Sequence, residues 1–228
     1  MKAIVISFAI ILASVSALPN LQVEKAIRSG QERLVTDQIV SVIEDISQAI
    51  IDAGLDPLII ENNEIDYALP VPSIFNVRGF LRGLLFQGAS NIVIDRMNLN
   101  ILTMRLTWNI RLPQILLNVV DSGVHANYFG KDFEASYSGR LAINRIVSTG
   151  DVRVSVGIIS GISVRSIALT VDLQGIESQL NLKIQGVDLS DYVNTYLGQT
   201  MPNTLKEFSG DINDLVTIVA KEVIETIL

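Results

Sequence analysis

The chain has 228 residues, of which 49% are hydrophobic and 18% charged, and its formal net charge is −7. This acidic balance argues against nucleic acid as a partner and against electrostatic docking on anionic membranes. The chain has no cysteine, so a disulfide framework and the usual zinc sites are not expected. Packing must then supply the stability, and the apolar excess is large enough to line an internal site.

The first residues are typical of a secretory signal peptide. Lys2 supplies the positive start, an apolar run follows from Ala3 to Ala13, and Val15-Ser16-Ala17 is a small-residue cleavage site. The run is too short to span a bilayer, and no later stretch reaches the roughly 18 apolar residues that a membrane helix needs. We expect 1–17 to be removed and 18–228 to be one secreted, extracellular domain with no integral membrane span.

An amphipathic helix is predicted at the start of the mature chain. Apolar residues recur at helical spacing from Leu21 to about Ala53. Asn20 is suited to the N-cap and Gly54 to the C-cap of this helix.

The end of the chain mirrors the start. Thr204 and Glu207 match a capping box directly after Pro202 and predict a last helix that continues to the C-terminus. A shorter helix that contains Leu189 and Val193 is expected to end before the proline.

Alternation of apolar and polar residues predicts strands in the centre. Apolar residues take the even positions from Leu102 to Leu112 and odd positions from Val93 to Ile101, which we interpret as a β-bulge or bend in one long strand. Short connections then predict an antiparallel meander between the helices, an α+β arrangement. The later alternating rows cover 133–143, 152–158, 167–173 and 180–184, and turns are expected near Ser122-Gly123, Gly130, Thr149-Gly150, Gly161 and Gln174-Gly175.

The segment from Gly54 to Ser90 is predicted to be largely irregular, because it contains three prolines. The range 77–86 is the candidate for a first strand there. An acidic cluster in the segment lacks the spacing and the glycine of a calcium loop, so we interpret it as solvated; it consists of Asp56, Glu61, Glu64 and Asp66.

Motifs of catalysis are missing. His125 is the single histidine, and the sequence 161–165 lacks the second glycine of a nucleophile elbow. Nothing points to the paired carboxylates of a glycoside hydrolase. We expect no enzyme activity, no catalytic or metal-binding residues and no cofactor. Four arginines could contact a ligand carboxylate or a lipid headgroup, but we interpret them as ordinary solvent-face residues; they are Arg78, Arg82, Arg105 and Arg111.

The order of elements resembles that of the tubular lipid-binding superfamily. Within it the chain is most similar to the arthropod group seven allergens, with the takeout and juvenile-hormone-binding proteins as close relatives. The takeout-type cysteine pair near the mature N-terminus is absent, which moves the resemblance towards the allergen-like branch. The matching residues are Gly54-Leu55-Asp56-Pro57-Leu58, Gly83-Leu84, Gly88 to Ile94 and Leu112-Pro113, together with the terminal helix.

The resemblance implies long amphipathic helices packed on a curved, highly bent antiparallel sheet, an elongated half super-roll with an apolar groove. Such a groove binds mainly by burying apolar area, so no sharp motif is expected. The predicted partner is a small hydrophobic or lipid-like ligand, and a homodimer is left open. The predicted ligand-binding residues are Leu102, Met104, Leu106, Trp108, Ile110, Val154, Val156, Leu169 and Val171.

Two alternatives stay open at this point. The first is a secreted defence or interaction protein that recognises bacterial lipid or a protein partner without transporting cargo. A protein that binds bacterial lipid is expected to carry a basic tip, and the net charge of −7 argues against such a tip. The second is a structural secreted protein whose own side chains fill the groove.

Overall fold

A computed structural model describes residues 32–157 and 161–227 of the chain. The predicted signal peptide at 1–17, the cap at Asn20 and the first part of the predicted N-terminal helix lie outside these ranges. The side chains at the ends of some elements, Val156 among them, also lie outside the description. What the structure describes begins with a helix, continues through the strands and ends with helices.

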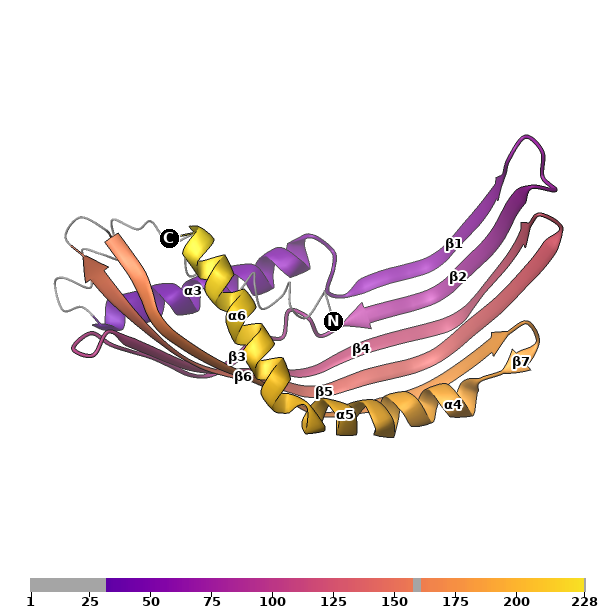
Figure 1. Ribbon diagram of the computed structural model, residues 1–228. Coiled ribbons are helices and arrows are strands. Elements are labelled where there is room, and N and C mark those ends of the chain that lie inside the picture. The colour runs from indigo at the N-terminus through magenta and orange to yellow at the C-terminus, as the bar shows by residue number, and fades with distance from the viewer. Residues whose placement is uncertain (1–31, 158–160, 228) are drawn as a thin grey trace.

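The strands form one antiparallel sheet that is long and curved (Figure 1). The strand order is β1-β2-β4-β5-β6-β7, and β3 pairs with β4. The predicted meander between helices is therefore confirmed, and with it the α+β fold with a bent sheet. The strands are β1 Leu58–Ala68, β2 Phe75–Gln87, β3 Val93–Asn100, β4 Arg105–Tyr128, β5 Lys131–Gly157, β6 Gly161–Ile184 and β7 Val187–Asp188.

The first described helix, α3, spans Glu32–Asp52 and ends as the sequence predicts. Gly54 follows it with φ of 66°, a conformation that glycine adopts without a steric cost. The buried stripe of α3 contains Ile39 and Ile43, four residues apart on one face. This stripe holds the helix against the sheet.

The C-terminal helices are more continuous than predicted. Pro202 does not end a helix, because the π-helical turn η1 before it bonds the Met201 amide to the Tyr196 carbonyl, five residues back. The capping box was also wrong: the Thr204 hydroxyl donates to the Thr200 carbonyl oxygen at 2.9 Å. The break comes later, at Phe208. The elements are α4 Ser190–Thr195, η1 Tyr196–Thr200, α5 Met201–Glu207 and α6 Ser209–Ile227.

The register change at Ile101-Leu102 is a hairpin turn, not the predicted bend in one strand. Strand β3 ends at Asn100, which faces Arg105 at the start of β4. The Asn100 side-chain oxygen accepts the amide of Thr103 at 2.9 Å and closes the turn. Met104 completes it with φ of 51°.

Three predicted turns lie inside long strands and were wrong. Ser122-Gly123 lies at a register irregularity within β4, Thr149-Gly150 stays paired within β5, and Gly175 pairs with Asn144 within β6. A glycine can mark a close neighbour as well as a turn: a Cβ on Gly123 would lie 2.8 Å from the Phe80 ring. The turn at Gly130 is confirmed, since β4 ends at Tyr128 and β5 begins at Lys131.

The segment from 54 to 90 contains more regular structure than its prolines suggested. The strand predicted at 77–86 is confirmed as β2, which is slightly longer. The strand β1 before it was missed, and it pairs with β2 from Leu58 to Ala68. Pro70 and Pro72 lie in the hairpin between the two strands, where no ladder hydrogen bond is lost.

Three neighbouring strands shift the row of their partly buried apolar residues near the middle of the sheet. In each strand the step between successive apolar positions is three residues instead of two. Pro113, which has no amide hydrogen for the ladder, and Arg145, with φ of 48°, lie at this level. The sheet therefore consists of two halves, each with its own alternation. The steps are Leu112 to Ile115 in β4, Ile143 to Ile146 in β5 and Leu173 to Ile176 in β6.

Side chains of the C-terminal helices cover the free edge of β6. Four residues of a helix rise about 6 Å and two residues of a strand about 6.6 Å, so helix positions i and i+4 match every second amide of the strand. The four bonds run from the amides of Leu182, Leu180, Val171 and Leu169 to the side-chain oxygens of Ser190, Asn194, Asn213 and Thr217, at 2.8–3.2 Å. This arrangement protects the edge from pairing with another chain.

Asn194 makes the largest contribution to this edge. Its side chain accepts from the Leu180 amide at 2.8 Å and the Ser178 hydroxyl at 2.6 Å, and it donates to the Leu180 carbonyl at 2.9 Å. Asn194→Ala leaves these partly buried groups without a partner and is expected to cost about 2 kcal/mol of unfolding free energy. Urea denaturation measures this loss. Thr195→Ala, at the exposed neighbour, is the control and should change the unfolding free energy by less than about 0.5 kcal/mol.

Candidate functional site

The apolar core lies at the end of the sheet where α3 and α6 pack (Figure 1). The side chains come from both helices and from β3 to β6, so each element contributes one apolar face. We use the name apolar core for the buried residues Ile39, Ile43, Leu99, Trp108, Ile110, Val152, Leu169 and Ala220.

Trp108 is the largest side chain of the apolar core and is 8% exposed. Its indole nitrogen donates to the Ser148 hydroxyl at 3.3 Å, which satisfies the one polar atom of the ring. Gly150 is its register partner on β5. A Cβ at Gly150 would lie 1.9 Å from the indole, so the absence of a side chain there makes room for the ring.

The structure brings most of the predicted ligand-binding residues together. Trp108, Ile110 and Leu169 belong to the apolar core, while the partly buried residues Met104, Leu106, Val154 and Val171 pack against it. Leu102 was predicted to continue the inward row, and this was wrong, because it lies in the β3–β4 turn with 93% of its surface exposed. The side chain of Val156 lies outside the described residues. Ligand binding by these residues stays a prediction.

A pocket of about 580 Å³ opens beside the apolar core. Three of the predicted residues line it: Leu102, Met104 and Val154. Met104 and Val154 also pack against the apolar core, so they form the wall between the two. We call this hollow the turn pocket; it is lined by Ile101, Leu102, Thr103, Met104, Arg153, Val154, Ser155, Arg165 and Ser166.

Two arginines belong to the turn pocket, and a third lies on the neighbouring strand. Arg153 and Arg165 line it, and Arg105 lies directly opposite Arg153 in the β4–β5 register. Arg105 donates to the Asp151 carboxylate at 2.7 Å, and this hydrogen bond holds the pKa of Asp151 below its usual value. Neither Arg153 nor Arg165 was predicted as a site residue from the sequence. The sequence does contain a signal for them, a local excess of positive charge, because the stretch 152–171 contains both arginines and no acidic residue.

The other half of the sheet presents a more open apolar face. Tyr67, Val77, Ala126 and Phe133 lie opposite one another on four neighbouring strands, and direct cross-strand partners share a face. Tyr67 is 53% and Phe133 44% exposed. The described helices pack mainly on β3 and β6, which explains this exposure.

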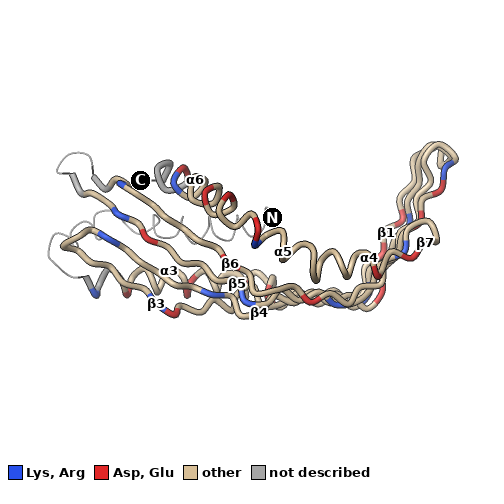
Figure 2. The backbone as a smooth tube through the Cα atoms, turned by 60° about the horizontal axis from the view of Figure 1, so that its bottom comes forward, with Lys and Arg blue, Asp and Glu red and all other residues tan. Residues whose placement is uncertain are grey.

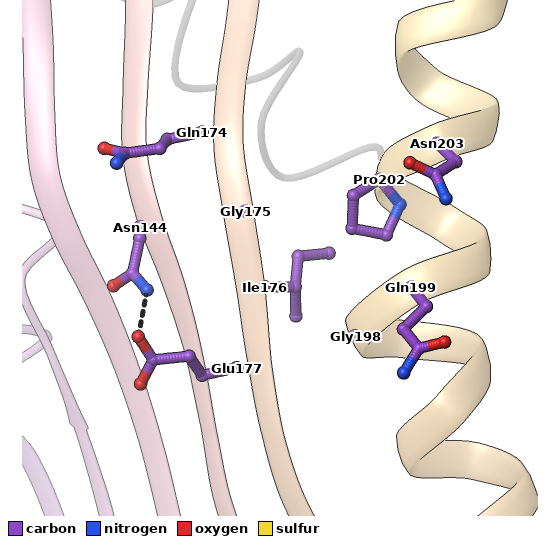
Figure 3. Close-up of a pocket in the computed structure, with 9 residues that line it drawn as sticks. All are labelled: Asn144, Gln174, Gly175, Ile176, Glu177, Gly198, Gln199, Pro202 and Asn203. Carbon is purple, nitrogen blue, oxygen red and sulfur yellow. Dashed lines mark hydrogen bonds between the residues drawn. The ribbon is translucent and has the colours of Figure 1, made fainter.

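A second hollow of about 520 Å³ lies between β6 and the η1–α5 helix and is mostly polar (Figure 3). Asn144 accepts from Gln114 and donates to Glu177, each at 2.7 Å, so these groups form a ladder across β4, β5 and β6. Ile176 points from the strand towards Pro202. The ladder satisfies its own polar groups and presents no nucleophile with an adjacent base.

The structure shows the surroundings of the charged residues that were interpreted from the sequence. All four arginines interpreted as solvent-face residues form ion pairs with partly or fully exposed acids, as Arg111 does with Asp95 at 2.8 Å. His125 is exposed and lies 3.6 Å from Asp132. The solvated reading of the acidic cluster was wrong for Asp56, which is buried and accepts hydrogen bonds from Gly88 and Ser90.

Two further observations bear on the class of site. Within 32–157 and 161–227, no group of three or more acidic or histidine side chains is arranged to hold a metal ion. None of the described helices combines the length and the apolar character needed to cross a membrane.

A family model described as "Haemolymph juvenile hormone binding protein (JHBP)" matches residues 6–228. The chain belongs to this family. The predicted relationship to the takeout and juvenile-hormone-binding proteins is thereby confirmed, while the narrower relationship to the group seven allergens stays a prediction. A comparison with curated sequences returned no match.

Solved structures give more distant similarities to this member of the juvenile hormone binding family. One is Takeout 1 of Epiphyas postvittana, with 13% identity, a TM-score of 0.35, and coverage of 75% of this chain and 76% of that one. Another is a lipopolysaccharide binding protein, with 11% identity and a TM-score of 0.25; the match covers 80% of this chain and 36% of that one.

Proposed function

We propose that this protein is a secreted, non-enzymatic carrier of a small hydrophobic or lipid-like ligand. The single observation that carries the proposal is the position of the turn pocket. Three of the nine residues predicted as ligand walls from the sequence line this hollow of about 580 Å³, and two of the three also pack on the apolar core. The name of the matching family, which refers to a hormone-binding haemolymph protein, supports ligand binding and secretion.

The energetics suit a ligand that binds through apolar area. Burial of apolar surface is worth roughly 25 cal/mol per Å², so a fatty chain gains several kcal/mol without directional anchors. Leu102 is almost fully exposed in the free protein, and a bound chain would cover it. A ligand in the turn pocket therefore buries protein surface that is otherwise in contact with water.

Leu102→Ser tests this role with little risk to the fold. The leucine contributes almost no buried surface to the free protein, but its loss should weaken the binding of a long-chain alcohol or terpenoid roughly tenfold. Fluorescence of Trp108, the one tryptophan of the chain, reports the titration. The matched control is Leu215→Ser, an exposed leucine on α6 that does not line the pocket. Equal affinities for the two variants would argue against this site.

The alternative of bacterial lipid recognition makes a different prediction. Such a protein should bind lipid A or lipoteichoic acid with a steep salt dependence, because phosphate groups dominate those surfaces. A carrier of apolar ligands should show affinities for long-chain alcohols that change little between 50 and 500 mM salt.

A further inference from the structure

We propose that the turn pocket recognises the anionic group of an amphipathic ligand, a carboxylate or a phosphate, through Arg153 and Arg165. This inference rests on the proposed carrier function and specifies the chemical class of the ligand. The apolar part of this ligand would lie on Leu102, Met104 and Val154.

The backbone places the two arginines side by side. On the β5–β6 ladder, Arg153 faces Ser166 and Val154 faces Val164, so Arg165 is the extra residue of a β-bulge. A bulge re-aims a side chain that would otherwise continue the alternation of the strand. Here it brings Arg165 to the rim of the same pocket as Arg153, from the neighbouring strand.

The charge around the pocket is unbalanced. Three arginines (105, 153 and 165) and one aspartate (151) leave a local net charge of +2 in a chain whose net charge is −7. The Asp151 carboxylate is hydrogen-bonded by Arg105 and also interacts electrostatically with Arg153, while no such interaction with Asp151 involves Arg165. No acidic residue occurs anywhere from 152 to 171, so this stretch of the sequence cannot supply a second counter-charge. Figure 2 shows the basic positions on the strands at this end of the sheet.

The remaining groups of the pocket suit an amphiphile. Thr103, Ser155 and Ser166 also line the pocket and carry hydroxyl groups, and the Ser155 hydroxyl is already hydrogen-bonded to the Ser163 hydroxyl at 2.7 Å. Arginine binds carboxylate and phosphate oxygens with paired, charge-assisted hydrogen bonds, which a neutral ester or alcohol cannot match. Apolar residues line the same pocket, and one of them, Leu102, is almost fully exposed in the β3–β4 turn. A ligand with one anionic end and one apolar tail would contact both the arginines and the apolar residues of the pocket.

The test compares ligands that differ only in the head group. Hexadecanoate, methyl hexadecanoate and hexadecyl phosphate are titrated into the full chain and into the double variant R153Q/R165Q. Wild type should bind at least one of the two anions about tenfold more tightly than the methyl ester. The variant should lose this preference to within about twofold and keep its affinity for the ester.

Controls separate head-group recognition from general charge. The double variant R78Q/R82Q removes the same charge from exposed positions on β2 and should keep the preference. R165K keeps the charge but loses the planar fork, and its preference should be intermediate. Tighter binding of hexadecanoate than hexadecyl phosphate identifies a carboxylate as the preferred head, and the reverse order identifies a phosphate. Both arginines are exposed, so the urea midpoints of the variants should stay close to wild type.

The outcomes are distinct. Equal binding of both anions and the ester by wild type, or a preference that survives in R153Q/R165Q, overturns the anion site and leaves the carrier function intact. Failure of wild type to bind any of the three ligands overturns the carrier function as well.

Discussion

Gly150→Ala is expected to lower the free energy of unfolding by about 3 kcal/mol, because the new methyl group and the Trp108 ring cannot occupy the same space. The Cβ would lie 1.9 Å from one indole carbon and 2.2 Å from another. The ring is enclosed by the apolar core, so relief requires movement of β4 or of the helices. A urea titration followed by Trp108 fluorescence measures both the stability and the displacement of the ring.

Gly175→Ala is the matched control for this substitution. Gly175 also lies inside a long strand, but a Cβ there would meet nothing within 4 Å. Its effect should stay within about 0.5 kcal/mol. A Gly150→Ala protein with unchanged stability and an unchanged emission maximum would show that the indole does not lie over β5 as described.

Asp56→Ala is expected to cost about 3 kcal/mol of unfolding free energy. The carboxylate is 6% exposed and accepts the Gly88 amide at 2.8 Å and both the amide and the hydroxyl of Ser90 at 2.6 Å. Its removal leaves buried donors without an acceptor, and hydrogen bonds to a charged group are worth more than neutral ones. Asp45→Ala, an exposed position on α3, should shift the urea midpoint very little.

The same carboxylate makes stability depend on pH. Burial alone would raise the pKa of Asp56, but the hydrogen bonds from Ser90 and Gly88 outweigh it and lower the pKa below the usual 3.8. Because the pKa of Asp56 is lower in the folded state, its carboxylate contributes fully to the free energy of unfolding above about pH 4. This contribution is lost as the pH falls through the pKa of the folded state. The stability gap between wild type and Asp56→Asn, measured in urea, should therefore narrow between pH 5 and pH 3. A gap that stays constant over this range would contradict the assignment.

The sequence predicted the elements that one buried face dominates. Leu106, Trp108 and Ile110 alternate because one side of β4 meets the helices, and Ile39 and Ile43 repeat at helical spacing for the same reason. Leu102 matches the alternation of apolar residues at even positions by coincidence. The β3–β4 turn contains neither glycine nor proline, and the side chain of Asn100 closes it instead. The residue types in this turn therefore did not indicate a hairpin.

Features that depend on a neighbouring strand could not be predicted. Gly150 has the appearance of a turn residue until Trp108 is placed opposite it. The position of Arg165 depends on a bulge in the β5–β6 ladder, and a register shift has no local signature in the chain. Asp56 appeared to be one of several solvated acids, because its partners Gly88 and Ser90 are more than 30 residues away.

Native mass spectrometry of protein that has been secreted and purified without detergent tests the carrier function most directly. A carrier should show a stoichiometric adduct of a small amphiphile that is lost on solvent extraction and regained when hexadecanoate or hexadecyl phosphate is added. A bare mass that stays unchanged after these additions, with no change in Trp108 fluorescence, would contradict it.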